Sequence, residues 1–288
     1  MLCSFARNME RHIGAMLDRA NDLSRSFREE TMTDILMGGL VSLRAYGVTV
    51  DFPVESQTGA DMEWIFAAED GSSHFTLLIQ AKRLYGSGAV WSRRSYPEIF
   101  HRVGGLAHGK LQSSLLVSEA ARRYATFPLY LFYTHKSVRD TMRIRGMIMH
   151  SLSFAGGKFI DGLVKDKQSG KLSATRTSNL RTIHPRMFSI SKILCPKPRR
   201  YRIANSRLSR TLELLEFDRQ ALVSRSSISP ATVRSRLVQA IGDDDIVPPL
   251  GEGPLPLFPY DEGLRSRYKV VFVSPPEART TYGEDDYR

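Results

Sequence analysis

Thr58-Gly-Ala-Asp-Met-Glu-Trp64 and Leu77-Leu-Ile-Gln-Ala-Lys-Arg83 are the two stretches that decide the fold. Residues 61–67 alternate into large apolar side chains, and residues 75–82 form an apolar run that ends in charge, so both are expected to be strands. Between them, Glu69-Asp-Gly-Ser-Ser73 has the composition of a tight turn. The sequence therefore predicts a β-hairpin.

Polar side chains meet on this predicted hairpin. Asp61, near the start of the first strand, faces Gln80 near the end of the second, because an antiparallel partner runs back alongside it. Gln80 and Lys82 share one face, because strand side chains alternate. Such a cluster at the end of a buried strand is costly to desolvate unless it binds something. A divalent cation and a phosphate group are the expected ligands.

Hydrophobic periodicity predicts the elements around the hairpin. We expect helices over residues 1–25, 27–43 and 110–124, a short strand over 49–53 and a buried strand over 127–134. The resulting order of helix, three strands, helix and strand is that of an α/β core. Beyond residue 140 we expect a polar loop over 166–179, short helices over 208–223 and 230–241, a proline-rich arm from 242, a final strand over 268–274 and an acidic tail over 283–288.

Composition bounds the class of protein. The chain has 288 residues, 42% of them hydrophobic, which is enough to fill a core. It has no run of roughly 20 apolar residues that would span a membrane, and its start is polar, so we expect a cytoplasmic protein with no membrane partner. Its two cysteines, Cys3 and Cys195, are too few for a disulfide framework. We expect both to remain reduced, with Cys195 in the core.

Charge indicates the kind of partner. The formal net charge is +11, and residues 165–236 alone hold 17 Lys and Arg against 4 Asp and Glu, a net charge of +13. Each phosphate that Lys or Arg neutralises releases a condensed counterion, so a polyanion is the expected partner. Nucleic acid fits, although an ordinary solvated surface has the same composition.

The hairpin resembles the core of the PD-(D/E)XK, or restriction-endonuclease-like, nuclease superfamily. There, an acid, a gap of one hairpin and then (Glu/Gln)-x-Lys after a hydrophobic strand carry the chemistry, and Asp61, Gln80, Ala81 and Lys82 stand at those positions. The resemblance covers about residues 25–135, and its sequence also looks like uncharacterised bacterial members. It implies an α/β fold with a mixed central sheet flanked by helices, followed here by a basic C-terminal extension.

The resemblance implies a role for each motif residue. Asp61, Gln80 and the backbone carbonyl of Ala81 would hold Mg²⁺ or Mn²⁺, and a glutamate of the preceding helix would reach the ion directly or through water. Lys82 would position the attacking water or help deprotonate it, and would stabilise negative charge in the transition state. Gln80 departs from the usual glutamate, and its neutral oxygen binds a hard cation less tightly than a carboxylate.

Acidic and amide candidates beyond the motif are less specific. Glu29 and Glu30 both lie in the first turn of the preceding helix, and we favour Glu29 because it shares the inward face with Met32 and Leu36. Glu63 is expected on the face of Asp61, where it would restore the missing charge; a solvated strand residue is the alternative. Gln112, on the helix after the motif, either faces the site or is an exposed helix residue.

Basic candidates follow the motif. Arg83, Arg93 and Arg94 are interleaved with Tyr85, Trp91 and Tyr96 in a stretch that we expect to be a loop. Such a loop would grip phosphates and stack on bases. An ordinary mobile surface loop is the alternative.

Two functional hypotheses and one structural alternative follow. The first is a metal-dependent endonuclease that acts on DNA, in bacterial defence or a mobile element, either alone, as a homo-oligomer or with an activating partner. The second is a nuclease-fold module that binds nucleic acid and has weak or no catalytic activity, and the third is a polyanion-binding structural protein with an accidental motif. We divide the chain into an N-terminal helix (1–25), a nuclease-like core (26–140), a basic region packed on it (141–241) and an arm with a final strand and tail (242–288).

Overall fold

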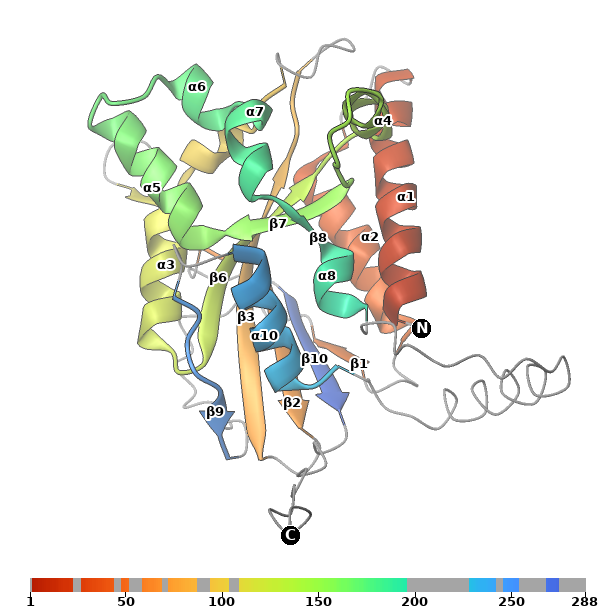
Figure 1. Ribbon diagram of the computed structural model, residues 1–288, viewed down its shortest axis with the longest axis vertical. Helices are drawn as coiled ribbons and strands as arrows, with labels where there is room; N and C mark the ends of the chain where they lie inside the picture. The colour runs from red at the N-terminus through yellow and green to blue at the C-terminus, as the bar shows by residue number, and fades with distance from the viewer. Residues whose placement is uncertain are drawn as a thin grey trace, which may run out of the picture.

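The computed structural model describes residues 2–22, 27–43, 48–51, 59–68, 72–86, 94–103, 109–195, 228–241, 246–253 and 268–274. These residues form an α/β fold in which helices flank a mixed central sheet (Figure 1). The expected fold class is confirmed at this level. The expected helix at 208–223, the acidic tail at 283–288 and Arg93 lie outside the described residues.

The central sheet has eight strands. Its order is β1-β10-β2-β3-β6-β7-β8, and β9 pairs with β3. β10 runs parallel to β2 and β3 runs parallel to β6, whereas the other neighbours are antiparallel. The strands are β1 (Val48–Asp51), β2 (Met62–Ala68), β3 (Ser73–Arg83), β6 (Thr126–Tyr133), β7 (Leu152–Gly156), β8 (Phe188–Ser189), β9 (Gly251–Glu252) and β10 (Tyr268–Ser274). A separate small sheet pairs β4 (Arg102–Val103) with β5 (Lys110–Leu111).

β2 and β3 form the predicted hairpin, with Met62 opposite Ile79 and Ala67 opposite His74. Both strands are buried along almost their whole length, because helices cover both faces of the sheet. The predicted final strand is β10, which lies inside the sheet between β1 and β2. β7 and β8 extend the same sheet on its other side, so the sheet is continuous across the expected boundary at residue 140.

Two apolar cores lie on the two faces of the sheet. Leu77, Ile79 and Ala81 of β3 point into the first core with side chains of α1, α2, α8 and α10, whereas Leu78 points into the second with side chains of α3, α5 and α7. This alternation follows from the two-residue period of a strand. The helices are α1 (Leu2–Asp22), α2 (Glu29–Val41), α3 (Gln112–Arg122), α4 (Lys136–Ile144), α5 (Gly157–Gln168), α6 (Ala174–Ser178), α7 (Leu180–Ile183), α8 (Ile190–Leu194) and α10 (Pro230–Ile241).

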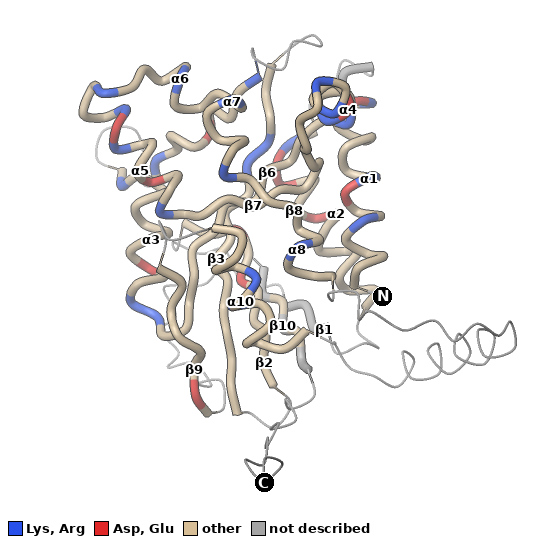
Figure 2. Tube along the Cα trace, in the orientation of Figure 1, with Lys and Arg blue, Asp and Glu red and all other residues tan. Residues whose placement is uncertain are grey.

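The region after residue 140 is more ordered than expected. Instead of a loop over 166–179, α5 continues to Gln168 and α6 follows, with the Ser173 side chain accepting a hydrogen bond from the Arg176 N–H at 3.2 Å. Within the described part of the basic region, Lys and Arg positions are distributed over α5 to α8 and α10 (Figure 2). Arg236 is buried and donates to the Ile193 carbonyl oxygen at 2.7 Å. Some of the positive charge therefore serves the fold.

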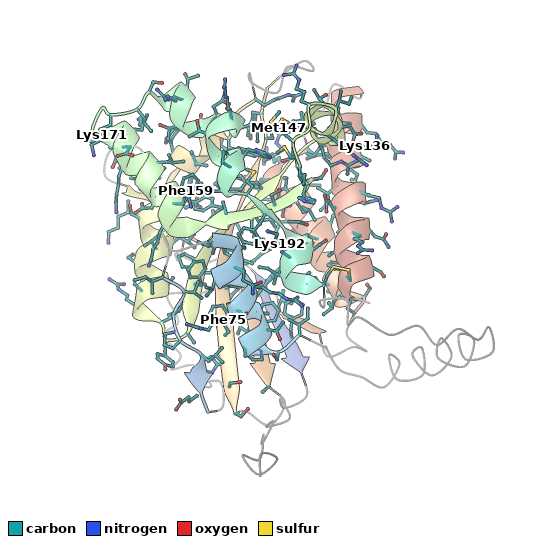
Figure 3. The ribbon with its side chains drawn as sticks, in the orientation of Figure 1. Phe75, Lys136, Met147, Phe159, Lys171 and Lys192 are labelled. Carbon is teal, nitrogen blue, oxygen red and sulfur yellow. A yellow bond between two sulfur atoms is a disulfide. The ribbon has the colours of Figure 1, made fainter. Side chains whose placement is uncertain are left out.

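The expectation of two reduced cysteines is wrong. Cys3 of α1 and Cys195, directly after α8, form a disulfide with their Cα atoms 4.3 Å apart (Figure 3). The two residues are separated by 192 positions, and only the packing of α1 and α8 in one core brings them together. Disulfides are uncommon in a reducing cytoplasm, so the cysteines no longer support a cytoplasmic location. In the described part of the chain, no helix has the length and apolar content to cross a bilayer.

Candidate active site

Asp61 is held at the point where the chain enters β2. Two residues earlier, Gly59 has a φ of +71°, and an added Cβ would lie 3.0 Å from the Gln112 carbonyl oxygen. Only glycine fits both this backbone conformation and this close approach to α3. The Asp61 N–H then donates to the Ile79 carbonyl oxygen at 2.9 Å, which fixes the carboxyl group beside the end of β3.

The Asp61 carboxylate contacts the predicted motif directly. Its Oδ2 atom accepts hydrogen bonds from the Ala81 N–H at 2.8 Å and from Gln80 Nε2 at 2.5 Å. Gln80 Nε2 also donates to the Ala81 carbonyl oxygen at 3.1 Å. Asp61, Gln80 and Ala81 therefore converge as the hairpin pattern predicts.

Glu29 completes the cluster from the first turn of α2. Its Oε1 atom pairs with Lys82 Nζ at 3.1 Å, and its Oε2 atom accepts from the Arg83 N–H at 3.1 Å. Thr33, one turn later, donates to the Glu29 carbonyl oxygen at 3.1 Å and shares a 2.9 Å hydrogen bond with the Tyr133 hydroxyl. These contacts tie the start of α2 to the ends of β3 and β6.

The electrostatics of Glu29 are unusual. Burial raises the pKa of its carboxyl group to about 7, opposed by the Lys82 ammonium and reinforced by the Asp61 carboxylate. An acid near neutrality is therefore held against an almost fully buried lysine. Titratable groups with such shifts are concentrated at functional sites, because catalysis needs acids and bases whose pKa values are matched to their task.

Three buried polar atoms near the cluster have no hydrogen-bond partner among the described residues: Gln80 Oε1, Tyr130 Oη and Gln112 Oε1. Buried polar atoms in native proteins are nearly always satisfied, so such atoms point to water or an ion. Tyr130 lies beside Gln80 in the parallel β3–β6 register. Burial, Asp161, Asp61 and Glu29 raise the pKa of the Tyr130 phenol, so it stays protonated.

The donor set fits a hard divalent cation. Gln80 Nε2 lies within hydrogen-bond reach of both the Asp61 carboxylate and the Ala81 carbonyl oxygen, so it occupies a point where their lone pairs meet. Rotating the amide by half a turn would bring the unpartnered Oε1 to that point. Three oxygens would then face one position, which is the chemistry that Mg²⁺ and Mn²⁺ require.

The remaining acidic and amide candidates have different positions. Glu30 is exposed, so Glu29 is the helix acid that reaches the cluster. Glu63 is buried but pairs with Arg123 of the α3 end at 3.3 Å, so the proposed compensation for Gln80 is not formed. Gln112 begins α3 and is half-buried next to the turn that precedes Asp61.

The basic candidates are not on an exposed loop. Arg83 and Arg94 are both buried, and the Arg83 guanidinium lies over the Tyr85 ring at 4.2 Å. Backbone bridges join Tyr85 to Ser95 and Ser95 to Asn179, which order this part of the chain. The expectation of an exposed surface loop is therefore wrong for the described residues, and Arg93 lies outside them. The role of Arg83 and Arg94 in nucleic-acid binding stays a prediction.

Sequence reasoning missed Tyr130 and His135. Tyr130 lies within an apolar run that predicts a buried strand, and only its register beside Gln80 places it near the cluster. His135 follows β6 and is buried, with no spacing to other histidines that would single it out.

Comparison with known proteins gives one match. A family model described as a family of unknown function, DUF6615, matches residues 2–271. No curated protein and no solved structure matches this chain. In the described residues, no three His, Cys, Asp or Glu side chains gather as a metal site; the cluster above offers two carboxylates, an amide oxygen and a backbone carbonyl.

Proposed function

The chain belongs to the DUF6615 family of unknown function, and we propose that it is a metal-dependent endonuclease that hydrolyses phosphodiester bonds in DNA. The observation that carries the proposal is the convergence of Asp61, Gln80, Ala81, Lys82 and Glu29 at the end of β3. This set corresponds to the motif of the PD-(D/E)XK superfamily, so we also propose a restriction-endonuclease-like core.

Asp61, Gln80 Oε1 and the Ala81 carbonyl would hold Mg²⁺ or Mn²⁺, with Glu29 directly or through water. When bound, the ion would polarise the phosphate and lower the pKa of water. The fit rests on the unpartnered Gln80 oxygen and on the all-oxygen donor set.

Lys82 has the position to act on the reacting groups. Its ammonium group is held by Glu29 at 3.1 Å at the same strand end as Asp61. From there it would orient a water against the phosphorus and stabilise the charge that develops on the phosphoryl oxygens. The water oxygen would form a bond to phosphorus, the bond to the leaving sugar oxygen would break, and the proton lost by water would balance the one gained by the leaving oxygen.

One observation favours the second candidate function, a nucleic-acid-binding module without turnover. The Gln80 amide presents its nitrogen, not its oxygen, to the Asp61 carboxylate. This arrangement satisfies Asp61 without a cation. A protein that has lost catalysis would keep it permanently, whereas an enzyme would exchange it for the metal.

A cleavage assay separates these functions. Purified protein is incubated with supercoiled plasmid and with linear single- and double-stranded DNA, in Mg²⁺, Mn²⁺ or EDTA. Lys82→Ala is the test variant, and Lys136→Ala is the control because it removes a lysine from an exposed i,i+4 pair with Asp140. We expect metal-dependent cleavage by the wild type and the control but none by Lys82→Ala. Folded protein that binds DNA and never cuts it would favour the binding module.

A further inference from the structure

A second polar cluster lies next to the proposed hydrolytic centre, where Arg83, Arg94 and His135 come together. Each residue is buried, with exposed fractions of 8%, 3% and 4% respectively. Arg83 belongs to β3, His135 follows β6, and Arg94 lies before the 3₁₀ helix at Pro97–Phe100. The strands are parallel neighbours, with Arg83 beside Tyr133, so Arg83 and His135 lie at the same end of these two strands. Arg94 and Arg83 are both close enough to His135 to interact with it electrostatically.

Two atoms of this cluster lack a partner. Within the described ranges, Arg83 Nε and His135 Nδ1 are buried and make no hydrogen bond. The His135 side chain does not cap α4, although the residue occupies the N-cap position. The buried Arg83 guanidinium forms no ion pair with a described residue, which is costly, so the cluster as it stands is incomplete.

The nearby acids are already engaged. Asp18 of α1 accepts from the Ser137 N–H at 2.8 Å and from the Ser137 hydroxyl at 2.6 Å. Glu29 accepts from Lys82 and from the Arg83 backbone N–H, not from its guanidinium. Neither acid therefore forms an ion pair with the Arg83 guanidinium among the described residues.

We propose that Arg83, Arg94 and His135 form a pocket for one phosphate group of a nucleic-acid strand, beside the proposed hydrolytic centre. A guanidinium fork and an imidazole N–H are the donors that tetrahedral phosphate oxygens accept. Tyr85, which is half-buried beneath Arg83, and the exposed Gly86, which accepts from Arg94, mark the side open to solvent.

The position of the pocket assigns it a role in substrate binding. Lys82 and Arg83 are consecutive, so their side chains leave the strand on opposite faces. The Glu29 carboxylate joins them, with one oxygen on Lys82 Nζ and the other on the Arg83 N–H. A phosphate on Arg83 is thus separate from the phosphate that Lys82 would act on, and holding it would fix the register of the strand in the site.

The state of His135 agrees with an unfilled anion pocket. Burial, together with Arg94 and Arg83 and opposed by Asp18 of α1, lowers the pKa of its imidazole to about 4. The ring is therefore neutral in the free protein at neutral pH. A phosphate anion placed between these cations would offset their repulsion and raise the pKa of His135.

The inference rests on the proposed function for the identity of the ligand, but binding can be tested without hydrolysis. Full-length protein with ¹⁵N-labelled imidazoles is titrated in EDTA with inorganic phosphate, and His135 signals are assigned with His135→Gln. We expect phosphate to shift these signals and raise the pKa of His135. Phosphate affinity should fall roughly tenfold or more in Arg83→Gln and stay unchanged in Arg143→Gln, which removes an exposed arginine of α4.

Oligonucleotides with and without a 5′-phosphate then identify the source of the phosphate. If both oligonucleotides compete with inorganic phosphate for the pocket, the pocket binds an internal diester. If only the 5′-phosphorylated oligonucleotide competes, the pocket binds a terminal phosphate. His135 signals that phosphate does not shift in the folded wild type would overturn the pocket, even if Arg83→Gln does not fold. Phosphate affinity that falls equally in Arg83→Gln and Arg143→Gln would also overturn it. Phosphate binding without metal-dependent cleavage would instead remove the nuclease and keep the pocket.

Discussion

Replacing Glu29 with glutamine should stabilise the metal-free protein at alkaline pH. The Glu29 carboxyl is buried at the start of α2 between Lys82 and the Asp61 carboxylate, and its pKa is raised from 4.5 to about 7. The folded protein therefore holds this proton more tightly than the unfolded chain does. The contribution of Glu29 to stability is fully present below pH 4.5 and is lost as the pH rises through 7.

The size of the effect follows from that shift. Each pKa unit corresponds to about 1.36 kcal/mol, so the shift from 4.5 to about 7 costs about 3 kcal/mol when the carboxyl is fully ionised. In a protein of this size each kcal/mol moves the melting temperature by about 2–4 °C. Glu29→Gln should therefore melt roughly 6–12 °C above the wild type at pH 8 and close to it at pH 4.5. If Glu29 serves the active site, the variant gains stability and loses cleavage.

The assay is thermal and urea denaturation in EDTA from pH 4.5 to 8. At each pH, the melting temperature and the free energy of unfolding of the variant are compared with those of the wild type. Other groups that titrate in this range, including His135, cancel in the difference. Glu30→Gln is the matched control, because Glu30 is the exposed neighbour in the same turn. If the melting temperatures of the wild type and Glu29→Gln differ by the same amount at every pH in this range, the reasoning is refuted.

Three further predictions concern the frame around the site. Because the folded-state pKa of His135 is lowered to about 4, its contribution to stability is present above pH 6.5 and is lost towards pH 4, by up to about 3 kcal/mol. His135→Gln should lack this loss and should therefore unfold at a lower pH than the wild type; an unchanged midpoint of acid denaturation would contradict the prediction. Reducing the Cys3–Cys195 disulfide, or replacing Cys3 in Cys3→Ser, should lower the free energy of unfolding by about 5 kcal/mol, because the two cysteines are 192 positions apart and the disulfide closes that loop. Identical midpoints of urea denaturation with and without reductant would contradict this prediction. Arg123→Ala should lower the free energy of unfolding by about 3–5 kcal/mol by leaving Glu63 buried without its cation, whereas Glu119 keeps its pairing with Arg122. The Mn²⁺ requirement for cleavage should stay unchanged; a changed requirement would place Glu63 in the site.

The hairpin was predictable because its signals are local. Apolar alternation predicted the strands, and the turn-like composition of residues 69–73 predicted the antiparallel pairing that the β2–β3 register shows. The choice of Glu29 over Glu30 also followed from helical period, since one face of α2 is buried. Local pattern was sufficient wherever one element determined which way a side chain pointed.

The rest depended on contacts between distant segments. Glu63 does point to the face expected from alternation, but Arg123, 60 residues later, pairs with it. Cys3 and Cys195 meet only through packing of α1 against α8, and β10 enters the sheet beside β2 although it comes last. Arg83 and Arg94 looked like part of a surface loop because their neighbours come from distant segments. Leu180 of α7 donates to the Arg94 carbonyl oxygen, and His135 interacts electrostatically with both arginines.

The central claim is that Asp61, Gln80 and Ala81 bind a divalent cation used for phosphodiester cleavage. The most direct test is the initial rate of plasmid cleavage as a function of Mn²⁺ concentration for the wild type and Gln80→Glu. A carboxylate binds a hard cation more tightly than an amide, so we predict cleavage by both proteins, with the half-maximal rate of Gln80→Glu reached at about tenfold lower Mn²⁺. Folded wild-type protein that cuts no DNA at any Mn²⁺ concentration would contradict the claim.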